Sequence, residues 1–292
     1  MHNDTENIAQ TLAKELPKPI VLLEQSSVTE DKAILHLALP NNFKHIQVDT
    51  ESLLDHPRRT KAAASLTEPA AFLEYVARHR GPTTVVWADF NPVTFKLSFK
   101  AVIDEHGPND VAGWRQHSAS FTPVLSNEWG IWTGNNGSKN AMDQFSFAMF
   151  LENQEDDIAV VEGFPTNLDM MKMATEFEAR QDQAIKSTVR IQNGGVELSY
   201  VSNDDAQTIE KMKVFDKFKI GIPVFRGMKD EMGKALGYLI EARLRYRTAQ
   251  GKATFWYELV RPDKTHEAAA DQLIRTIKEG LGDVPMLMGS SS

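Results

Sequence analysis

Apolar and polar residues alternate with a period of two in several parts of this chain, which predicts strands with one buried face. The clearest example is the segment 241–262, EARLRYRTAQGKATFWYELVRP. Its first run alternates charged residues with Leu244 and Tyr246, and a second run, rich in aromatic and branched side chains, follows Gln250-Gly251. The pattern predicts a β-hairpin that ends at Pro262, with three arginines on one face. These arginines are Arg243, Arg245 and Arg247.

The same period recurs elsewhere. We expect a long strand over 93–103 that pairs with 114–125, because the turn 107–110 between them contains Gly, Pro, Asn and Asp. Asn193-Gly194 predicts a further hairpin, since this dipeptide suits the tight turns that join antiparallel strands. Additional strands are expected at 33–39, 83–87 and 218–224.

Helical periodicity and capping residues predict the helices. A capping hydroxyl and an early proline mark the beginning of one helix at Thr67-Glu68-Pro69. Helices are expected at 8–16, 70–79, 139–152, 166–177 and 267–279. Two other segments are expected to be irregular, namely 53–66 and the Trp/Gly-rich connector 127–134.

These elements predict an α+β fold, built from an antiparallel, hairpin-rich sheet with flanking helices and a small N-terminal α/β part. We expect the parts to form one continuous structural unit. In chain order they are an N-terminal α/β part (1–88), a long β-hairpin with the Trp/Gly-rich connector (89–135), a helical segment (136–185), antiparallel hairpins with a C-terminal helix (186–284), and a Gly/Ser-ended tail that resembles a cloning remnant (285–292).

Composition narrows the functional classes. The 292 residues include 32 basic and 40 acidic ones, and the formal charge of −8 argues against a broad surface for duplex nucleic acid. The absence of cysteine excludes disulfides, thiolate zinc sites and cysteine nucleophiles. We see neither a signal peptide nor an apolar run of roughly 20 residues, and therefore expect a soluble protein without membrane contact.

Catalytic signatures are missing from the sequence. It contains no GxxxxGK[ST], GxGxxG, GxSxG or HExxH motif, so we predict no catalytic residue and no cofactor. A divalent metal remains one hypothesis. If the turn of the first hairpin centres near residue 110, Asp104 lies opposite His117 with His106 on the same face, and a carboxylate with two imidazoles can ligate zinc, manganese or iron. Solvated or simply hydrogen-bonded side chains are the alternative.

The three arginines suggest an anion-binding surface, because guanidinium groups bind carboxylate or phosphate in a bidentate manner. Trp256 on the neighbouring strand could add base stacking. A second basic cluster, Arg58, Arg59 and Lys61, could act on the same anion. The alternative is that Glu241 and Glu258 neutralise the arginines by pairing across the strands.

Several segments together resemble a known family. They are FKAVIDEH, GWRQHSASF, the Glu128-Trp129 pair with the IWTG that follows it, FKIGIPVF and ARLRYRTAQGKATFWYELVRP. The chain resembles the YfdQ-like prophage proteins from about Leu53 to the C-terminal helix. This resemblance implies a phage-encoded protein that acts in the host cytoplasm, and it supplies no catalytic residues.

Three functions are compatible with these observations. The first is a non-enzymatic phage accessory protein that binds single-stranded nucleic acid or a nucleotide in phage DNA replication or recombination. The second is a self-assembling or ligand-sequestering protein that counters host defence, by holding a nucleotide signal or occupying a host protein. The third is a metal-dependent hydrolase that uses the aspartate and two histidines above. Hairpins with unpaired edge strands also lead us to expect a homo-oligomer.

Overall fold

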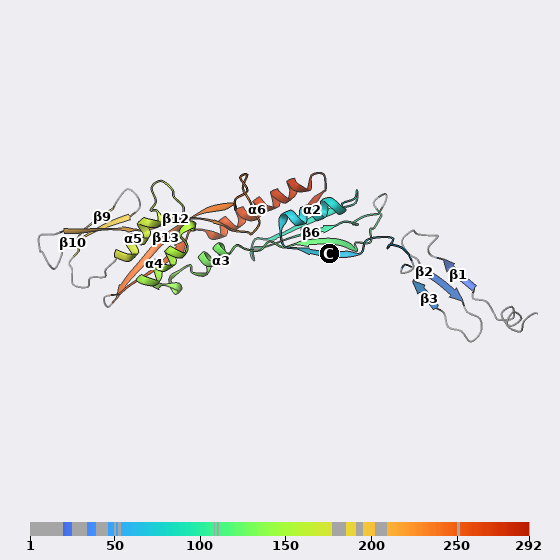
Figure 1. Cartoon of the computed structure of the whole chain (residues 1–292), viewed down its shortest axis with the longest axis horizontal. Helices are drawn as coiled ribbons and strands as arrows, with labels where there is room; N and C mark the ends of the chain where they lie inside the picture. Colours follow the sequence, from blue (N-terminus) through green and yellow to red (C-terminus); the bar gives the residue numbers. More distant parts are fainter. Residues whose placement is uncertain are drawn as a thin grey trace, which may run out of the picture. The chain divides into compact units, whose positions relative to one another are not determined.

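The computed structural model describes most of the chain as helices and antiparallel strands (Figure 1). It describes residues 20–24, 34–38, 46–49, 51, 54–107, 109, 111–176, 185–190, 195–201, 209–249 and 252–291. The chain divides into two compact units, Met1–Ala62 and Ala63–Ser292. Helices and mainly antiparallel sheets make up the described residues, and the predicted α+β fold is confirmed.

The first unit contains a three-stranded antiparallel sheet of order β1-β2-β3. Its strands are β1 (Ile20–Glu24), β2 (Ile34–Ala38) and β3 (Ile46–Asp49). The strand expected at 33–39 is therefore β2. The helix expected at 8–16 lies outside the described residues.

The second unit begins with a five-stranded sheet of order β15-β5-β6-β7-β4. Its strands are β4 (Ala62–Leu66), β5 (Val85–Asn91), β6 (Lys96–Val102), β7 (His117–Phe121) and β15 (Met286–Met288). The helix α2 (Pro69–His79) covers one face of the sheet. Phe72 of α2 is fully buried, with its ring centroid 6.3 Å from that of Phe99 and 5.9 Å from that of Phe121. The alternation in β6 and β7 supplies this apolar face.

Two segments expected to lack regular structure belong to this sheet. Residues 62–66 form β4, and residues 286–288 form β15, which pairs in parallel with β5. Backbone hydrogen bonds from Val86 N to Pro285 O and from Gly289 N to Ala88 O hold β15 in place. Both strands are too short for a period of two to distinguish them from loops, so only tertiary pairing reveals them.

A four-stranded antiparallel sheet, of order β12-β13-β14-β8, forms the other large layer of this unit. Its strands are β12 (Lys217–Pro223), β13 (Gly237–Ala249), β14 (Lys252–Leu259) and β8 (Met142–Asp143). β13 and β14 are the predicted arginine-rich hairpin. Its inner face packs against helices through buried aromatic rings: the Phe147 and Phe255 rings stack at 5.2 Å, and those of Trp132 and Tyr257 lie 4.9 Å apart.

The helices beside this sheet differ from the sequence expectation at two places. The Trp/Gly-rich connector is the helix α3 (Asn127–Gly134), whose beginning is capped by Ser126 Oγ accepting from Trp129 N at 2.9 Å. The helix expected from residue 139 is interrupted by a 3₁₀ turn (Ser138–Asn140) and β8, so α4 comprises Gln144–Asn153. A second 3₁₀ turn comprises Glu155–Asp157, and α5 comprises Asn167–Glu176.

The second unit contains a third sheet, of order β11-β10-β9, which is antiparallel throughout. Its strands are β9 (Ile185–Arg190), β10 (Gly195–Val201) and β11 (Ile209–Phe215). The pairing of β9 with β10 confirms the hairpin expected around Asn193-Gly194, although that dipeptide itself lies outside the described residues.

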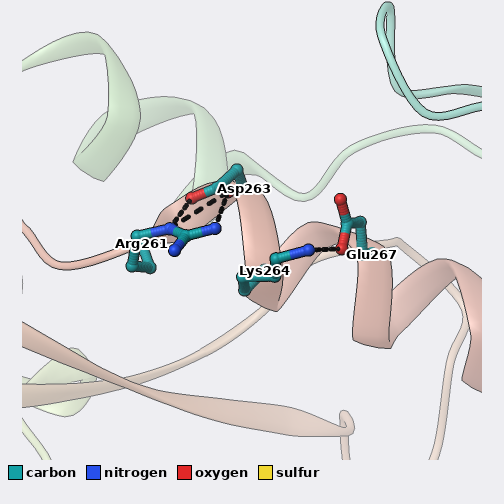
Figure 2. A network of polar contacts seen from close by, with 4 residues as sticks. All are labelled: Arg261, Asp263, Lys264 and Glu267. Atoms are coloured by element: carbon teal, nitrogen blue, oxygen red, sulfur yellow. Dashed lines mark hydrogen bonds and ion pairs between the residues drawn. The ribbon is translucent and has the colours of Figure 1, made fainter.

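The last helix, α6 (Pro262–Leu281), contacts both α2 and β13. It begins five residues before the sequence expectation, directly after Arg261, whose φ of 52° is left-handed. Figure 2 shows the ion pairs that surround this beginning: Arg261 Nη2 contacts Asp263 Oδ2 at 2.7 Å, and Lys264 binds Glu267. No helix in the described part of the chain is both long and apolar enough to cross a membrane.

Candidate functional site

Strand register places the predicted arginines on the outer face of the four-stranded sheet. Directly paired residues of antiparallel strands point to the same face. Arg243 pairs with Lys217 on one side and Glu258 on the other, and Arg245 pairs with Trp256. We call this surface the basic sheet face. Among the side chains that the structure describes, its charged members are Lys217, Lys219, Glu241, Arg243, Arg245, Arg247, Glu258 and Asp143.

The alternation of the sequence explains why this face stays accessible. Leu244, Phe255 and Tyr257 point to the inner face and are buried. The three arginines alternate with these inward positions and are exposed. The strands therefore separate an apolar inner layer from a charged outer one. Of the eight charged side chains that the structure describes on the outer face, five are cationic.

Ion pairs neutralise part of this charge. Arg245 Nε lies 3.5 Å from Glu258 Oε2, and Lys217 Nζ lies 3.1 Å from Glu241 Oε1. Both pairs are largely solvated, so an external anion can compete with the carboxylates. Within the described residues, Arg243 and Arg247 form no ion pair. The alternative to anion binding was that Glu241 and Glu258 neutralise the arginines. Within the described residues, this pairing involves one arginine of the three, Arg245.

Aromatic groups accompany the cations. Trp256 is half-buried on the basic sheet face, and its buried indole N–H has no hydrogen-bond partner within the part of the chain that the structure describes. The ammonium of Lys219 lies 4.6 Å from the centre of the Phe164 ring, a cation–π contact. The surface therefore combines guanidinium groups with part of an indole ring.

The second basic cluster belongs to the other unit. Arg58 and Lys61 are exposed and Arg59 is half-buried. Lys61 Nζ lies 3.0 Å from Glu51 Oε2. Whether this cluster acts on the same anion as the basic sheet face stays a prediction.

The candidate metal ligands take part in hydrogen bonds. Both carboxylate oxygens of Asp104 accept backbone N–H groups at 3.0 Å, one from Gln116 and one from His117. His117 Nε2 lies 2.9 Å from the hydroxyl of Tyr75, while His106 is exposed. Among the described residues, no three His, Cys, Asp or Glu side chains are grouped to hold a metal ion.

His117 has a neighbour that sequence reasoning missed. The rings of His79, in the last turn of α2, and His117 lie 5.1 Å apart, and the Tyr75 ring lies 4.5 Å from that of His79. Burial lowers the pKa of His117, and the adjacent His79 lowers it further, while the Asp104 carboxylate acts in the opposite direction. In the sequence, this cluster is indicated by the spacing of Tyr75 and His79, which places them one helical turn apart on the same side of the helix.

A second missed contact joins α3 to the 3₁₀ turn Glu155–Asp157. Trp132 is fully buried, and its Nε1 donates to Asp157 Oδ2 at 2.7 Å. Burial raises the pKa of Asp157, although this hydrogen bond acts in the opposite direction. The carboxylate of Asp157 in this turn therefore helps to hold α3 in place.

The fold and this surface define an α+β protein with an exposed, cationic sheet face. The model of a family described as "Uncharacterized conserved protein (DUF2303)" matches residues 5–291, and the chain belongs to this family. No curated protein and no solved structure gave a significant match.

Proposed function

We propose that this protein is a non-catalytic binding protein whose basic sheet face binds single-stranded nucleic acid. The supporting observation is the concentration of five cationic side chains and a half-buried tryptophan on one sheet face of a chain with a net charge of −8. Sequence-tolerant binding of single strands combines these two components, cations for phosphates and aromatic rings for bases.

The geometry favours a single strand over a duplex. Arg243, Arg245 and Arg247 follow one another at every second position of β13, about 6.8 Å apart, which is similar to the spacing of successive phosphates in an extended strand. The acidic remainder of the chain would repel a broad polyanion, whereas a narrow strand can follow β13 alone. The partly exposed Trp256, opposite Arg245, lies where a base of that strand could stack.

The resemblance to YfdQ-like prophage proteins supplies the biological setting of this proposal. In that setting, the protein would bind single strands exposed during phage DNA replication or recombination in the host cytoplasm. This role requires no metal, and it leaves Asp104 in its observed role as an acceptor for backbone N–H groups.

Fluorescence anisotropy of a labelled oligothymidine of about 20 nucleotides tests the proposal at low salt. The double variant Arg243→Ala/Arg247→Ala should bind at least about tenfold more weakly than the wild type, because each lost phosphate contact costs roughly 1 kcal/mol or more. Both side chains are exposed, so the variant should retain its circular dichroism spectrum and melting temperature.

The matched control is Arg78→Ala/Lys278→Ala, which removes the same charge from exposed positions of α2 and α6. It should bind like the wild type. Equal affinities for the two double variants, or no binding by the wild type at low salt, would refute the proposal. A duplex of the same length that binds as tightly as the single strand would refute the strand preference.

A further inference from the structure

A cleft beside the turn between β5 and β6 is a second candidate site. This cleft, of about 650 Å³, lies between the β5–β6 turn, the segment after β7, Phe225 and the first turns of α6. This volume suits a small molecule. Residues central to the argument are Asp89, Phe95, Lys96, Ser98, Phe225 and His266, all of which line the cleft.

His266 is the most unusual of these residues. The residue is only 6% exposed, and its ring centroid lies 5.0 Å from that of Phe95, 5.2 Å from that of Phe225 and 5.7 Å from that of Trp129. Its Nδ1 is buried, with no hydrogen-bond partner among the described residues. Burial lowers the pKa of His266, so the ring is neutral near pH 7. A neutral imidazole packed among aromatic rings forms part of an apolar wall of the cleft.

The turn between β5 and β6 places Phe95 in this wall. Asn91 Oδ1 accepts from the backbone N–H of Val93 at 2.9 Å and of Thr94 at 3.0 Å. Phe95 then has a φ of 56°, a left-handed conformation that a bulky residue rarely adopts. Such strain of about 1–3 kcal/mol persists where surrounding contacts enforce it. Here the contact is the edge-to-face packing of Phe95 on His266.

Charged and polar groups lie beside the aromatic wall. Asp89 pairs with Ser98, and Asn91 pairs with Lys96, so these four side chains share one face of the hairpin. Asp89, Lys96 and Ser98 are exposed. Within the described residues, neither Asp89 nor Lys96 forms an ion pair. The cleft thus contains one carboxylate and one ammonium beside an apolar wall, and neither group forms an ion pair within the described residues.

We propose that this cleft binds a nucleoside 5′-monophosphate, independently of the basic sheet face. The base packs against Phe95, Phe225 and His266. The carboxylate of Asp89 accepts hydrogen bonds from the sugar hydroxyls, as an acidic residue does in the dinucleotide sites of doubly wound α/β folds. The ammonium of Lys96 pairs with the phosphate. An aromatic amino acid is the competing ligand, since it also carries a ring and both charges.

Isothermal titration calorimetry with AMP, GMP, CMP and UMP tests this assignment, with the four matching nucleosides and phenylalanine as comparison ligands. At least one monophosphate should bind with a Kd below about 1 mM. Lys96→Gln should weaken that binding about tenfold and leave the affinity for the matching nucleoside unchanged, because only the phosphate contact is lost. Asp89→Asn should weaken the binding of both.

The matched control is Lys100→Gln, which lies on the same face of β6 but outside the cleft. It should bind like the wild type, as should Arg243→Ala/Arg247→Ala. Equal affinities of the two lysine variants would overturn the proposal, as would phenylalanine binding in preference to every monophosphate, or no monophosphate binding. Loss of monophosphate binding in the double arginine variant would place the site on the basic sheet face instead.

Discussion

The salt dependence of single-strand binding is the most discriminating prediction for the basic sheet face. Each phosphate neutralised by the protein releases counterions, so the slope of log K against log salt concentration counts the contacts. The perturbation is the removal of Arg243 and Arg247, the two arginines of this face that form no ion pair within the described residues.

The structure gives the expected magnitude. Two of the five cations are paired with Glu241 and Glu258, which leaves Arg243, Arg247 and Lys219 for phosphate. Three contacts predict a slope of about −2 for a single strand, so affinity should fall about 20-fold between roughly 50 and 200 mM salt. The double variant retains one contact, and its slope should be about −0.7, a loss of only about threefold.

Fluorescence anisotropy at four or more salt concentrations measures both slopes with the same labelled strand. The Arg78→Ala/Lys278→Ala control should keep the wild-type slope, since its net charge equals that of the arginine variant. A wild-type slope near zero would show that phosphate contacts do not drive binding. Indistinguishable slopes for wild type and arginine variant would move the contacts away from β13.

Three further predictions concern stability. Trp132→Phe should lower the free energy of unfolding by about 2–4 kcal/mol in urea, because it removes the donor to the half-buried Asp157 and some core volume; a loss below about 1 kcal/mol would contradict this. His117 and His266 have lowered pKa values in the folded protein, so the unfolded chain takes up protons first, and the melting temperature should fall as the pH drops below about 6.5. A melting temperature that stays constant between about pH 7 and 5.5 would refute that linkage. A chain ending at Val284 lacks β15 and should melt several degrees lower by differential scanning fluorimetry, whereas an unchanged value would make β15 dispensable.

Long elements with a sustained period could be predicted from the sequence. The hairpin of β13 and β14 is specified by alternation over many residues, since the branched and aromatic positions can be buried only if the arginines face outward. The apolar stripes of α2 and α6 were equally informative. In α6, His266 occupies the same stripe as Ala270 and Leu273, and a histidine at such a position was the available signal for its burial.

Short elements and long-range contacts could not be predicted in this way. The strands β4 and β15 are formed because their backbone groups complete a sheet whose other strands come from distant parts of the chain. α3 was expected to be a connector because its Trp and Gly content is unusual for a helix. Ser126 at its beginning and the contact between Trp132 and Asp157 stabilise it, and the latter joins residues far apart in sequence.

The features of the candidate sites likewise fall into two groups, those set by local sequence pattern and those set by long-range packing. The sequence by itself determined the α+β class and the row of three arginines on one face, because the alternation of side chains along a strand is a local property. Tertiary structure decided which carboxylates neutralise the cations, that Asp104 accepts backbone N–H groups, and that Phe95, Phe225 and His266 meet at one cleft. These outcomes depend on packing between distant segments, which no local pattern of residues encodes.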